Sequence, residues 1–554
     1  MKIPVRLAKP PRALGSRLTA TLLALIISGC SPFQARDFRS LSSKVGFDLS
    51  NNQNKVCSTA PIVGKSTLQR LNRVEYNNTL RDLLGIQTRP ADAFPTDTMG
   101  EWFTNNADAL SLDTPLLDKY FSAAEAAINE AFTLNRSRFM ICSAQTTVCA
   151  AQILKAFADK AYRRSATDTE VNNLVKFISV AQSQNESFEV GIKLAMRAAL
   201  VSSDFLYREI IHPAPNDPNS TIELSGYELA SRLSYFLWSS MPDEALLAAA
   251  RDNSIQRPEV LRAQVKRMLA DPKASSFVDN FGIQSFGLQF LGNNPPDGGM
   301  FPQYNSQLRE AMLTETKMLL QEIITRDLNP DTLVKADYSF VNESLASLYG
   351  MTGVRGASFT KVSLSGANRQ GVLGHAGILT LTSHSTDPSI VLRGKFVIKN
   401  LLCDPPSAPP TVIKNDPTIS DANQSKSRLN NPACMSCHLG MDPIGYALQG
   451  FNVLGIPRTT DEKGAPLDLT GKFTDGTTFS GAIELSNTVA KDPRYNLCIA
   501  KKLLSYSLGR DLNKLDNCAV SQIAAEATPG KTFSDLIVGL VTNDSFRKQS
   551  GGTK

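Results

Sequence analysis

Histidine and tryptophan are scarce in this sequence: its 554 residues include four His and two Trp, and aromatic residues make up 7%. Three catalytic and phosphate-binding patterns are also missing, namely G-x-S-x-G, G-x-x-x-x-G-K-[ST] and G-x-G-x-x-G. The first absence disfavours serine-hydrolase chemistry on a nucleophile elbow. The other two disfavour a glycine-rich phosphate loop. With only four histidines, each candidate imidazole ligand can be judged individually.

Excess charge is small, and most of it lies at one end of the chain. There are 58 Lys and Arg against 52 Asp and Glu, a formal net charge of +6. Residues 1–29 hold five of the basic residues and no acidic residue, so the rest of the chain carries about +1. A nucleic-acid-binding surface needs clustered Lys and Arg. We therefore expect no nucleic-acid partner.

Long apolar runs are likewise missing, apart from a short one near the N-terminus. Residues 18–27 (LTATLLALII) form an apolar stretch too short to span a bilayer and follow a basic segment, as in a secretory signal peptide. The run stops at Ile27-Ser28-Gly29-Cys30, which resembles a bacterial lipobox. We expect cleavage before Cys30 and lipidation of its thiol; the alternative is an ordinary signal peptide with a chance cysteine.

A lipid on Cys30 would attach the protein to a membrane without a spanning helix. Ser31 follows the cysteine, which by the bacterial sorting rule favours the outer membrane. The expected location is thus the cell envelope, lipid-anchored in the outer membrane and facing the periplasm or the exterior. Residues 30–64 are rich in Ser, Asn and Lys and are expected to form a tether.

One motif in the chain indicates a bound cofactor: Cys434-Met435-Ser436-Cys437-His438, a C-x-x-C-H sequence. In c-type haem attachment the two thiols bond the porphyrin and the histidine ligates the iron. A structural zinc site is the alternative, but it needs further ligands, and the chain has no second C-x-x-C and no H-x-x-x-H. The sequence therefore predicts one covalent haem c on Cys434 and Cys437, with His438 as a ligand.

A second axial ligand would come from the remaining histidines. His212 lies in IIHPAP, where we expect a solvent-facing loop, and Met441 is only three residues after His438, on the same side of the ring. His375 and His384 precede the motif, and either could ligate the iron on its distal side; the alternative for each is a structural histidine.

Six cysteines remain after Cys30 and the motif are set aside. In an exported chain six cysteines suggest up to three disulfides. Cys142 and Cys149 enclose a short turn-like stretch and form the most credible bridge. Cys498 and Cys518 are further candidates, with each other or with Cys403 or Cys57, and several of these four could instead be buried thiols.

Helical patterns predominate, so the fold class is expected to be mainly α, with several helical units followed by a haem c-bearing unit and a small β-hairpin region. Capping-box sequences precede helical patterns at Asn72, Thr167 and Ser225. Residues 411–430 are expected to form a loop. The expected domain order is a lipoprotein signal peptide (1–29), a tether (30–64), an N-terminal helical unit (65–135), a small helical unit (136–185), a large helical unit (186–330), a haem c-bearing unit (331–460) and a C-terminal unit (461–554).

Motifs of a known kind occur along nearly the whole mature chain: RLNRVEYNNTLRDLLG, CAAQILKAFADKAYRRSATDTE, LSGYELASRLSYFLWSSMPDEALL, DYSFVNESLASLYG, RQGVLGHAGIL, SIVLRGKFVIKNLLC, PACMSCHLGMDPIGYALQGFNVLGIPR and CIAKKLLSYSLGR. Together they resemble the planctomycete-type cytochrome c family in a lipoprotein form, with domains of the DUF1587, DUF1595, DUF1592, DUF1588 and DUF1585 types. The resemblance implies a covalent haem on Cys434 and Cys437 and an envelope location. It also ranks His375 first as distal ligand, because relatives often have Met or His there. Gln449 and Asn452 depart from the family's usual Glu and Asp.

Three functional hypotheses follow. The first is a lipid-anchored, single-haem electron-transfer protein with a redox partner protein in the envelope. The second is a haem-dependent oxidoreductase, peroxidase-like or dehydrogenase-like, with a substrate cleft in the helical part, because more than 350 residues precede the motif and an electron shuttle does not need them. The third is an envelope binding or scaffold protein with a structural haem.

Overall fold

The structure, a computed structural model, describes residues 68–405, 421–461 and 464–552. The signal segment 1–29, the tether 30–64 and Cys30 lie outside these residues. The described chain divides into two compact units. Unit 1 consists of Leu84–Pro90 and Leu117–Leu206, and unit 2 contains the other described residues. Among the described residues, none of the helices combines the length and apolarity needed to cross a bilayer.

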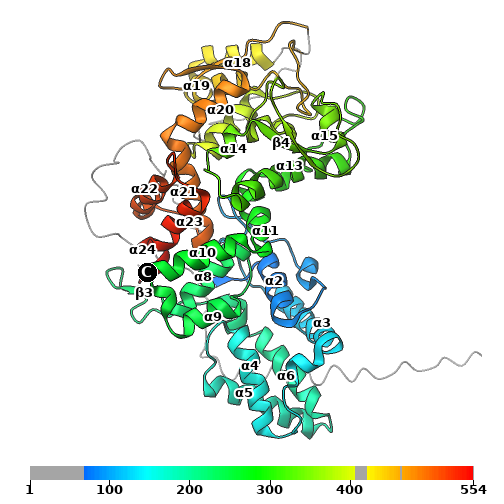
Figure 1. Cartoon of the computed structure of the whole chain (residues 1–554), viewed down its shortest axis with the longest axis vertical. Helices are drawn as coiled ribbons and strands as arrows, with labels where there is room; N and C mark the ends of the chain where they lie inside the picture. The colour runs from blue at the N-terminus through cyan, green and yellow to red at the C-terminus, as the bar shows by residue number, and fades with distance from the viewer. Residues whose placement is uncertain (1–67, 406–420, 462–463, 553–554) are drawn as a thin grey trace, which may run out of the picture. The chain divides into compact units, whose positions relative to one another are not determined.

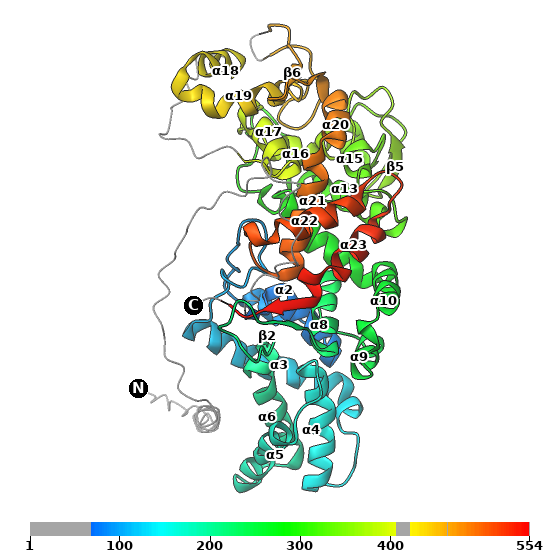
Figure 2. The same ribbon diagram turned by 90° about the vertical axis from the view of Figure 1, so that its left-hand side faces the viewer.

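Unit 1 is a set of packed helices, of which α4, α5 and α6 lie side by side (Figures 1 and 2). Helix α5 begins at a capping box in which Thr167 and Glu170 bond each other's main chain, as the sequence predicts. Most of α3 also belongs here and is kinked at Asn135. The helices are α3 (Thr114–Phe139), α4 (Thr147–Ala161), α5 (Asp168–Ser183), α6 (Phe188–Leu200) and α7 (Ser203–Leu206).

The N-terminal part of unit 2 begins with a short antiparallel pair, β1 (Gln69–Arg70) with β2 (Tyr207–Arg208). Helix α2 (Arg73–Leu84) follows, and Asn72 and Glu75 cap it reciprocally at 2.9 and 3.0 Å. The helix stops before Gly85, whose φ of +72° is left-handed and suits glycine. A second pair joins β3 (Thr221–Glu223) to the C-terminal strand β8 (Lys548–Ser550).

The middle of unit 2 is helical and is built around an aromatic cluster. Phe277 stacks on Phe281 at 4.7 Å between ring centroids, and Tyr506 packs edge-on against Phe277 at 6.1 Å. Ser225 and Glu228 form the capping box expected before α8. The helices are α8 (Gly226–Trp238), α9 (Glu244–Arg251), α10 (Pro258–Ala270), α11 (Ser275–Phe277), α12 (Ile283–Ser285), α13 (Ser306–Thr325) and α14 (Thr332–Lys335).

The rest of unit 2 contains the C-x-x-C-H motif, on a helix packed between neighbours at the top of Figure 1. Two more antiparallel pairs occur here, β4 (Tyr338–Val341) with β5 (Thr360–Ser363) and β6 (Thr470–Lys472) with β7 (Thr478–Ser480). The helices are α15 (Glu343–Leu348), α16 (Ala376–Leu381), α17 (Ile390–Phe396), α18 (Asp421–Asn430), α19 (Pro432–Tyr446), α20 (Gly481–Lys491), α21 (Pro493–Leu508), α22 (Asn517–Ala524), α23 (Phe533–Thr542) and α24 (Asp544–Arg547).

The expected fold class is confirmed, because the described chain is mainly helical with small antiparallel strand pairs, including the hairpin expected after the motif. The prediction of a loop over 411–430 is wrong for its second half. Residues Asp421–Asn430 form helix α18, which packs against α19 and buries Ser425 there. Its sequence is polar, so tertiary contacts rather than an apolar stripe account for the helix.

Candidate haem-binding site

Helix α19 presents the three residues of the motif on one face. Cys434, Cys437 and His438 stand at positions i, i+3 and i+4, which places their side chains over adjacent turns on the same side of the helix. Cys434 is 7% exposed, and Cys437 is partly buried against the hydrophobic core. Both are present as thiols. The helix thus aligns two thiols and an imidazole over about one turn.

His438 is oriented by a carboxylate on its own helix. Its Nδ1 lies 2.9 Å from Oδ1 of Asp442, four residues later, and Asp442 is fully buried. A carboxylate oxygen accepts, so Nδ1 carries the proton, and the lone pair of the neutral ring then resides on Nε2. A histidine held through one nitrogen with a lone pair on the other is the usual form of a metal-ligating histidine.

Helix α18 holds the other oxygen of Asp442. The Ser425 hydroxyl donates to Oδ2 at 2.6 Å, and Arg428 Nε lies 3.4 Å from the same atom. Ser425 and Asp442 are both fully buried, and the side chain of Arg428 is 10% exposed. A buried carboxylate is tolerated only when it is paired and hydrogen-bonded. These contacts supply that pairing.

Helix α19 is fixed against α17 by two glycines at a close crossing. A Cβ on Gly394 would lie 1.9 Å from the carbonyl oxygen of Met441, and one on Gly445 would lie 1.9 Å from that of Ile390. Arg393, from the same turn of α17, donates to carbonyls that follow α19, including that of Phe451 at 2.8 Å. The backbone that carries the motif is therefore held by main-chain contact.

The donor set of this face fits haem c. Two thiols three residues apart are the groups that form thioether bonds, and an oriented imidazole next to the second thiol is the expected axial ligand. The orientation of His438 is the observation that makes the fit specific, because its Nδ1 is committed to Asp442 and Nε2 is then the ring nitrogen that could ligate an iron. Within the described ranges, no group of three or more His, Cys, Asp and Glu side chains is arranged to hold a metal ion by itself.

His375 lies at the start of α16 in a buried polar cluster. The residue is 1% exposed, its Nδ1 is 2.9 Å from the Thr316 hydroxyl on α13, and its Nε2 is buried with no hydrogen-bond partner. Burial lowers the pKa of His375, which favours the neutral imidazole. No described hydrogen bond joins His375 to the motif helix.

The surroundings of His375 are unusually polar for a core. Glu315 is fully buried and accepts from the Ser339 hydroxyl at 2.7 Å and from the Tyr349 hydroxyl at 2.8 Å. The Arg369 guanidinium lies 3.5 Å from the centroid of the Tyr349 ring. Burial, followed by the charge of Glu315, raises the pKa of Tyr349 well above its usual range. Such a network, with each carboxylate oxygen satisfied, specifies one packing of α13 against α16.

The two other histidines differ from each other. His384 is exposed, in the turn before α17, where its backbone N–H donates to the carbonyl of Asp387 at 2.8 Å. The expectation that His212 faces solvent is wrong, because the residue is 7% exposed. Its ring bridges a loop: Nδ1 accepts from the N–H of Ala214 at 3.0 Å, and Nε2 lies 3.2 Å from the carbonyl of Ser220. With both nitrogens engaged, His212 has no lone pair to offer an iron.

The cysteines outside the motif are in disulfides where the structure describes them. The bridge expected between Cys142 and Cys149 is present. Cys403 pairs with Cys498, one of the alternatives that the sequence left open, so Cys498 does not pair with Cys518. Cys518 is itself disulfide-bonded. Cys30, where lipidation is expected, lies outside the described residues.

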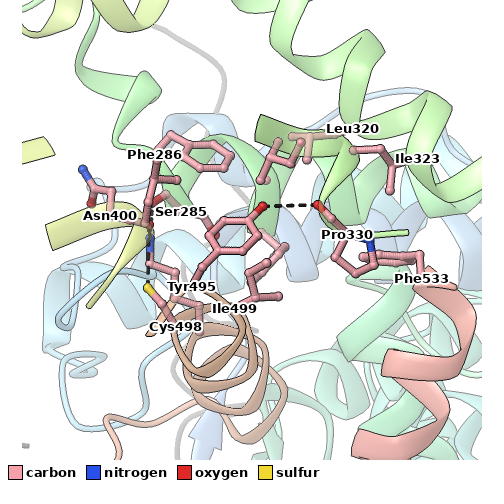
Figure 3. A pocket seen from close by; sticks show the side chains of 15 residues that line it. Ser285, Phe286, Leu320, Ile323, Pro330, Asn400, Tyr495, Cys498, Ile499 and Phe533 are labelled. Atoms are coloured by element: carbon pink, nitrogen blue, oxygen red, sulfur yellow. Dashed lines mark hydrogen bonds between the residues drawn. The ribbon is translucent and has the colours of Figure 1, made fainter. Parts of the chain in front are cut away.

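An apolar cavity of about 60 Å³ lies in unit 2 (Figure 3). Tyr495 projects into it, and its hydroxyl donates to the carbonyl of Pro330 at 3.2 Å. Buried Lys502 lies at its wall and donates to the carbonyls of Ser285 and Asn400 at 2.6 and 2.8 Å. Burial, and next the charge of Lys399, lower the pKa of Lys502 to about 7. None of the three motif residues lines this cavity.

The sequence did not single out the residues around the motif that matter most for its geometry. Asp442 could have been found from its i+4 spacing to His438, the spacing at which helical side chains meet. Ser425 and Arg428 carry no such signal, because they lie on α18, where the sequence predicts a loop.

Protein-family models match most of the chain. The chain therefore contains the domains of cytochrome c-type proteins, and it belongs to the planctomycete cytochrome c-type family, as its motifs predict. The matches are to proteins of unknown function described as DUF1587 over residues 69–133, DUF1595 over 149–209, DUF1592 over 224–351, DUF1588 over 369–461 and DUF1585 over 475–546. The DUF1588 match contains α16, α17, α18 and α19. No curated protein and no solved structure matches the chain.

Proposed function

We propose that this protein is a lipid-anchored, single-haem c-type protein of the cell envelope that accepts and donates electrons. The observation that carries the proposal is the face of α19, where two thiols adjoin a histidine whose Nδ1 is already bonded to Asp442. When bound, haem c supplies a one-electron ferric–ferrous couple. The family to which the chain belongs agrees with this chemistry but has no described activity.

In this proposal each residue of the motif has a distinct role. Cys434 and Cys437 would hold the haem covalently, and His438 would ligate the iron through Nε2. Helix α17 keeps these groups in register, since the close contacts at Gly394 and Gly445 leave α19 no space to slide. A fixed ligand geometry suits electron transfer, which needs little rearrangement between oxidation states.

His375 is proposed as the distal ligand, with His384 as the alternative. The Nε2 of His375 is buried and has no hydrogen-bond partner, which is rare for a polar atom in a protein core. Thr316 holds the opposite nitrogen, so the ring is oriented like that of a ligand. His384 is exposed and lacks such orientation. The orphaned nitrogen is the reason for preferring His375.

The location follows from the N-terminal sequence. We propose that Cys30 carries the lipid, that the mature protein lies at the outer membrane and that its redox partner is a protein of the envelope. Replacing Cys30 with Ser should release the protein into the aqueous phase of a detergent phase separation. A Cys30→Ser protein that still partitions with the detergent would contradict a lipid anchor at this residue.

A haem-dependent oxidoreductase is the second candidate, and one observation favours it. The carboxylate on the proximal histidine strengthens electron donation to iron and so favours oxidised states. The apolar cavity of Figure 3 is lined by residues other than those of the motif, so this cavity does not serve as a substrate cleft beside them.

The coordination of the reduced protein distinguishes the two candidates. An electron-transfer protein with two axial ligands should give a low-spin ferrous spectrum that does not change when carbon monoxide is added. A five-coordinate, high-spin ferrous spectrum with rapid carbon monoxide binding would overturn the electron-transfer proposal in favour of the oxidoreductase.

A further inference from the structure

We propose that Asp442 is a positioning residue that tunes the iron through His438. Its carboxylate accepts the Nδ1–H of the ligand and makes the imidazole a stronger donor, so that the protein stabilises the ferric state. The inference rests on the proposed function and adds to it the sign of an effect: Asp442 lowers the midpoint potential of the haem.

The geometry of the pair is that of a strong hydrogen bond. The His438 Nδ1 and Asp442 Oδ1 are 2.9 Å apart, the carboxylate is fully buried and the imidazole is 17% exposed. Hydrogen bonds to an ionised acceptor are about twice as strong as neutral ones. Exclusion of water raises their electrostatic effect further. The ligand therefore experiences the carboxylate with little screening by water.

The second oxygen of Asp442 has partners of its own. Ser425 donates to Oδ2 at 2.6 Å, and Arg428 Nε approaches it at 3.4 Å, both from α18. Because His438 uses Oδ1 and α18 uses Oδ2, the carboxylate cannot rotate without losing one set of contacts. Each donor to Oδ2 also withdraws negative charge from Oδ1. The uncharged Ser425 hydroxyl thus weakens the effect of Asp442 on His438.

His375, a buried histidine of the same unit, shows that a carboxylate partner is not a general feature of the unit's histidines. His375 is bonded at Nδ1 to the uncharged hydroxyl of Thr316, at the same distance of 2.9 Å. Only the histidine of the C-x-x-C-H motif, among the four in the chain, has a described hydrogen bond to a carboxylate. A purely structural role would not require an acid at that site.

Two substitutions should move the midpoint potential in opposite directions. Asp442→Asn keeps the size and the acceptor oxygen but removes the charge, so donation from His438 weakens and the potential rises. Ser425→Ala removes a neutral donor from Oδ2, which leaves more negative charge for His438, so the potential falls. A loss of stability alone does not predict a higher potential for Asp442→Asn together with a lower one for Ser425→Ala. It also does not predict the lower potential of Ser425→Ala taken by itself.

The experiment uses the full chain produced with covalent haem. Haem content is measured as the pyridine haemochrome, and the potential by optical titration with redox mediators. Asp468→Asn is the matched control, because it removes the same charge from an exposed position before β6 in the same unit. It should leave the potential close to that of the unmodified protein.

The outcomes separate this inference from the proposed function. A rise for Asp442→Asn and a fall for Ser425→Ala support it. If Asp442→Asn keeps one covalent haem and an unchanged potential, the inference is overturned and the proposed function stands. If Asp442→Asn does not fold, Ser425→Ala decides alone: a fall supports the inference, and an unchanged or raised potential overturns it. If the unmodified chain takes up no covalent haem, both fail.

Discussion

The close crossing of α17 and α19 makes a quantitative prediction about stability. A methyl group added at Gly394 or at Gly445 would lie 1.9 Å from a main-chain oxygen of the other helix, whereas such contacts are not found below 3.0 Å. The two helices must therefore separate by about 1 Å. Overpacking of this kind costs about 1–3 kcal/mol. Alanine's higher helix propensity returns up to about 1 kcal/mol, so we expect Gly445→Ala to lower the free energy of unfolding by about 1–2 kcal/mol.

Gly440 provides the matched control on the same helix. A Cβ there would meet only the Thr474 methyl group, at 3.9 Å. Gly440→Ala should therefore gain helix propensity without a clash and stabilise the protein by up to about 1 kcal/mol. Urea unfolding followed by circular dichroism measures both variants, and unchanged m-values allow the comparison. If Gly394→Ala and Gly445→Ala are as stable as Gly440→Ala, the main-chain contact does not hold α19.

Three further predictions concern the buried lysine, the disulfides and the distal ligand. Burial lowers the pKa of Lys502 to about 7, whereas its value in the unfolded chain is about 10.4. Between these two pH values the unfolded chain binds more protons than the folded protein, so the free energy of unfolding rises with pH. Lys502→Met should flatten that rise between pH 7 and 9, and equal slopes of urea midpoints would contradict the assignment. Removing the Cys403–Cys498 bridge, with a sequence separation of 95, should destabilise its unit by about 4.7 kcal/mol. Removing Cys142–Cys149, with a separation of 7, should cost about 2.5 kcal/mol, and similar losses in urea unfolding would refute the loop-entropy reasoning. His375→Ala should convert a low-spin ferrous spectrum into a high-spin one that binds carbon monoxide, whereas an unchanged spectrum would transfer the role to His384.

Local signals in the sequence located much of the helical framework. Capping residues fix where α2, α5 and α8 begin, because Asn72, Thr167 and Ser225 satisfy main-chain groups within one turn. The hairpin of β6 and β7 was visible as a small β-hairpin region. These features depend on neighbours in sequence, which a sequence displays directly.

Features that depend on tertiary contact were missed. Helix α18 has a polar sequence and was expected to be a loop, and it is helical where Ser425 and Arg428 meet Asp442 on α19. His212 was expected at the surface but is buried, since a loop closes over it through Ala214 and Ser220. The motif itself could be identified from five residues, whereas the carboxylate network behind His438 requires two helices to be placed together.

The central claim, a covalent haem c on α19, is tested most directly by haem attachment. The full chain, produced with a haem c maturation system, should retain one haem after denaturation and solvent extraction, measured as the pyridine haemochrome per chain. A double variant with Cys434→Ser and Cys437→Ser should retain none. An intact chain that loses all its haem on extraction, or a double variant that keeps it, would contradict the account.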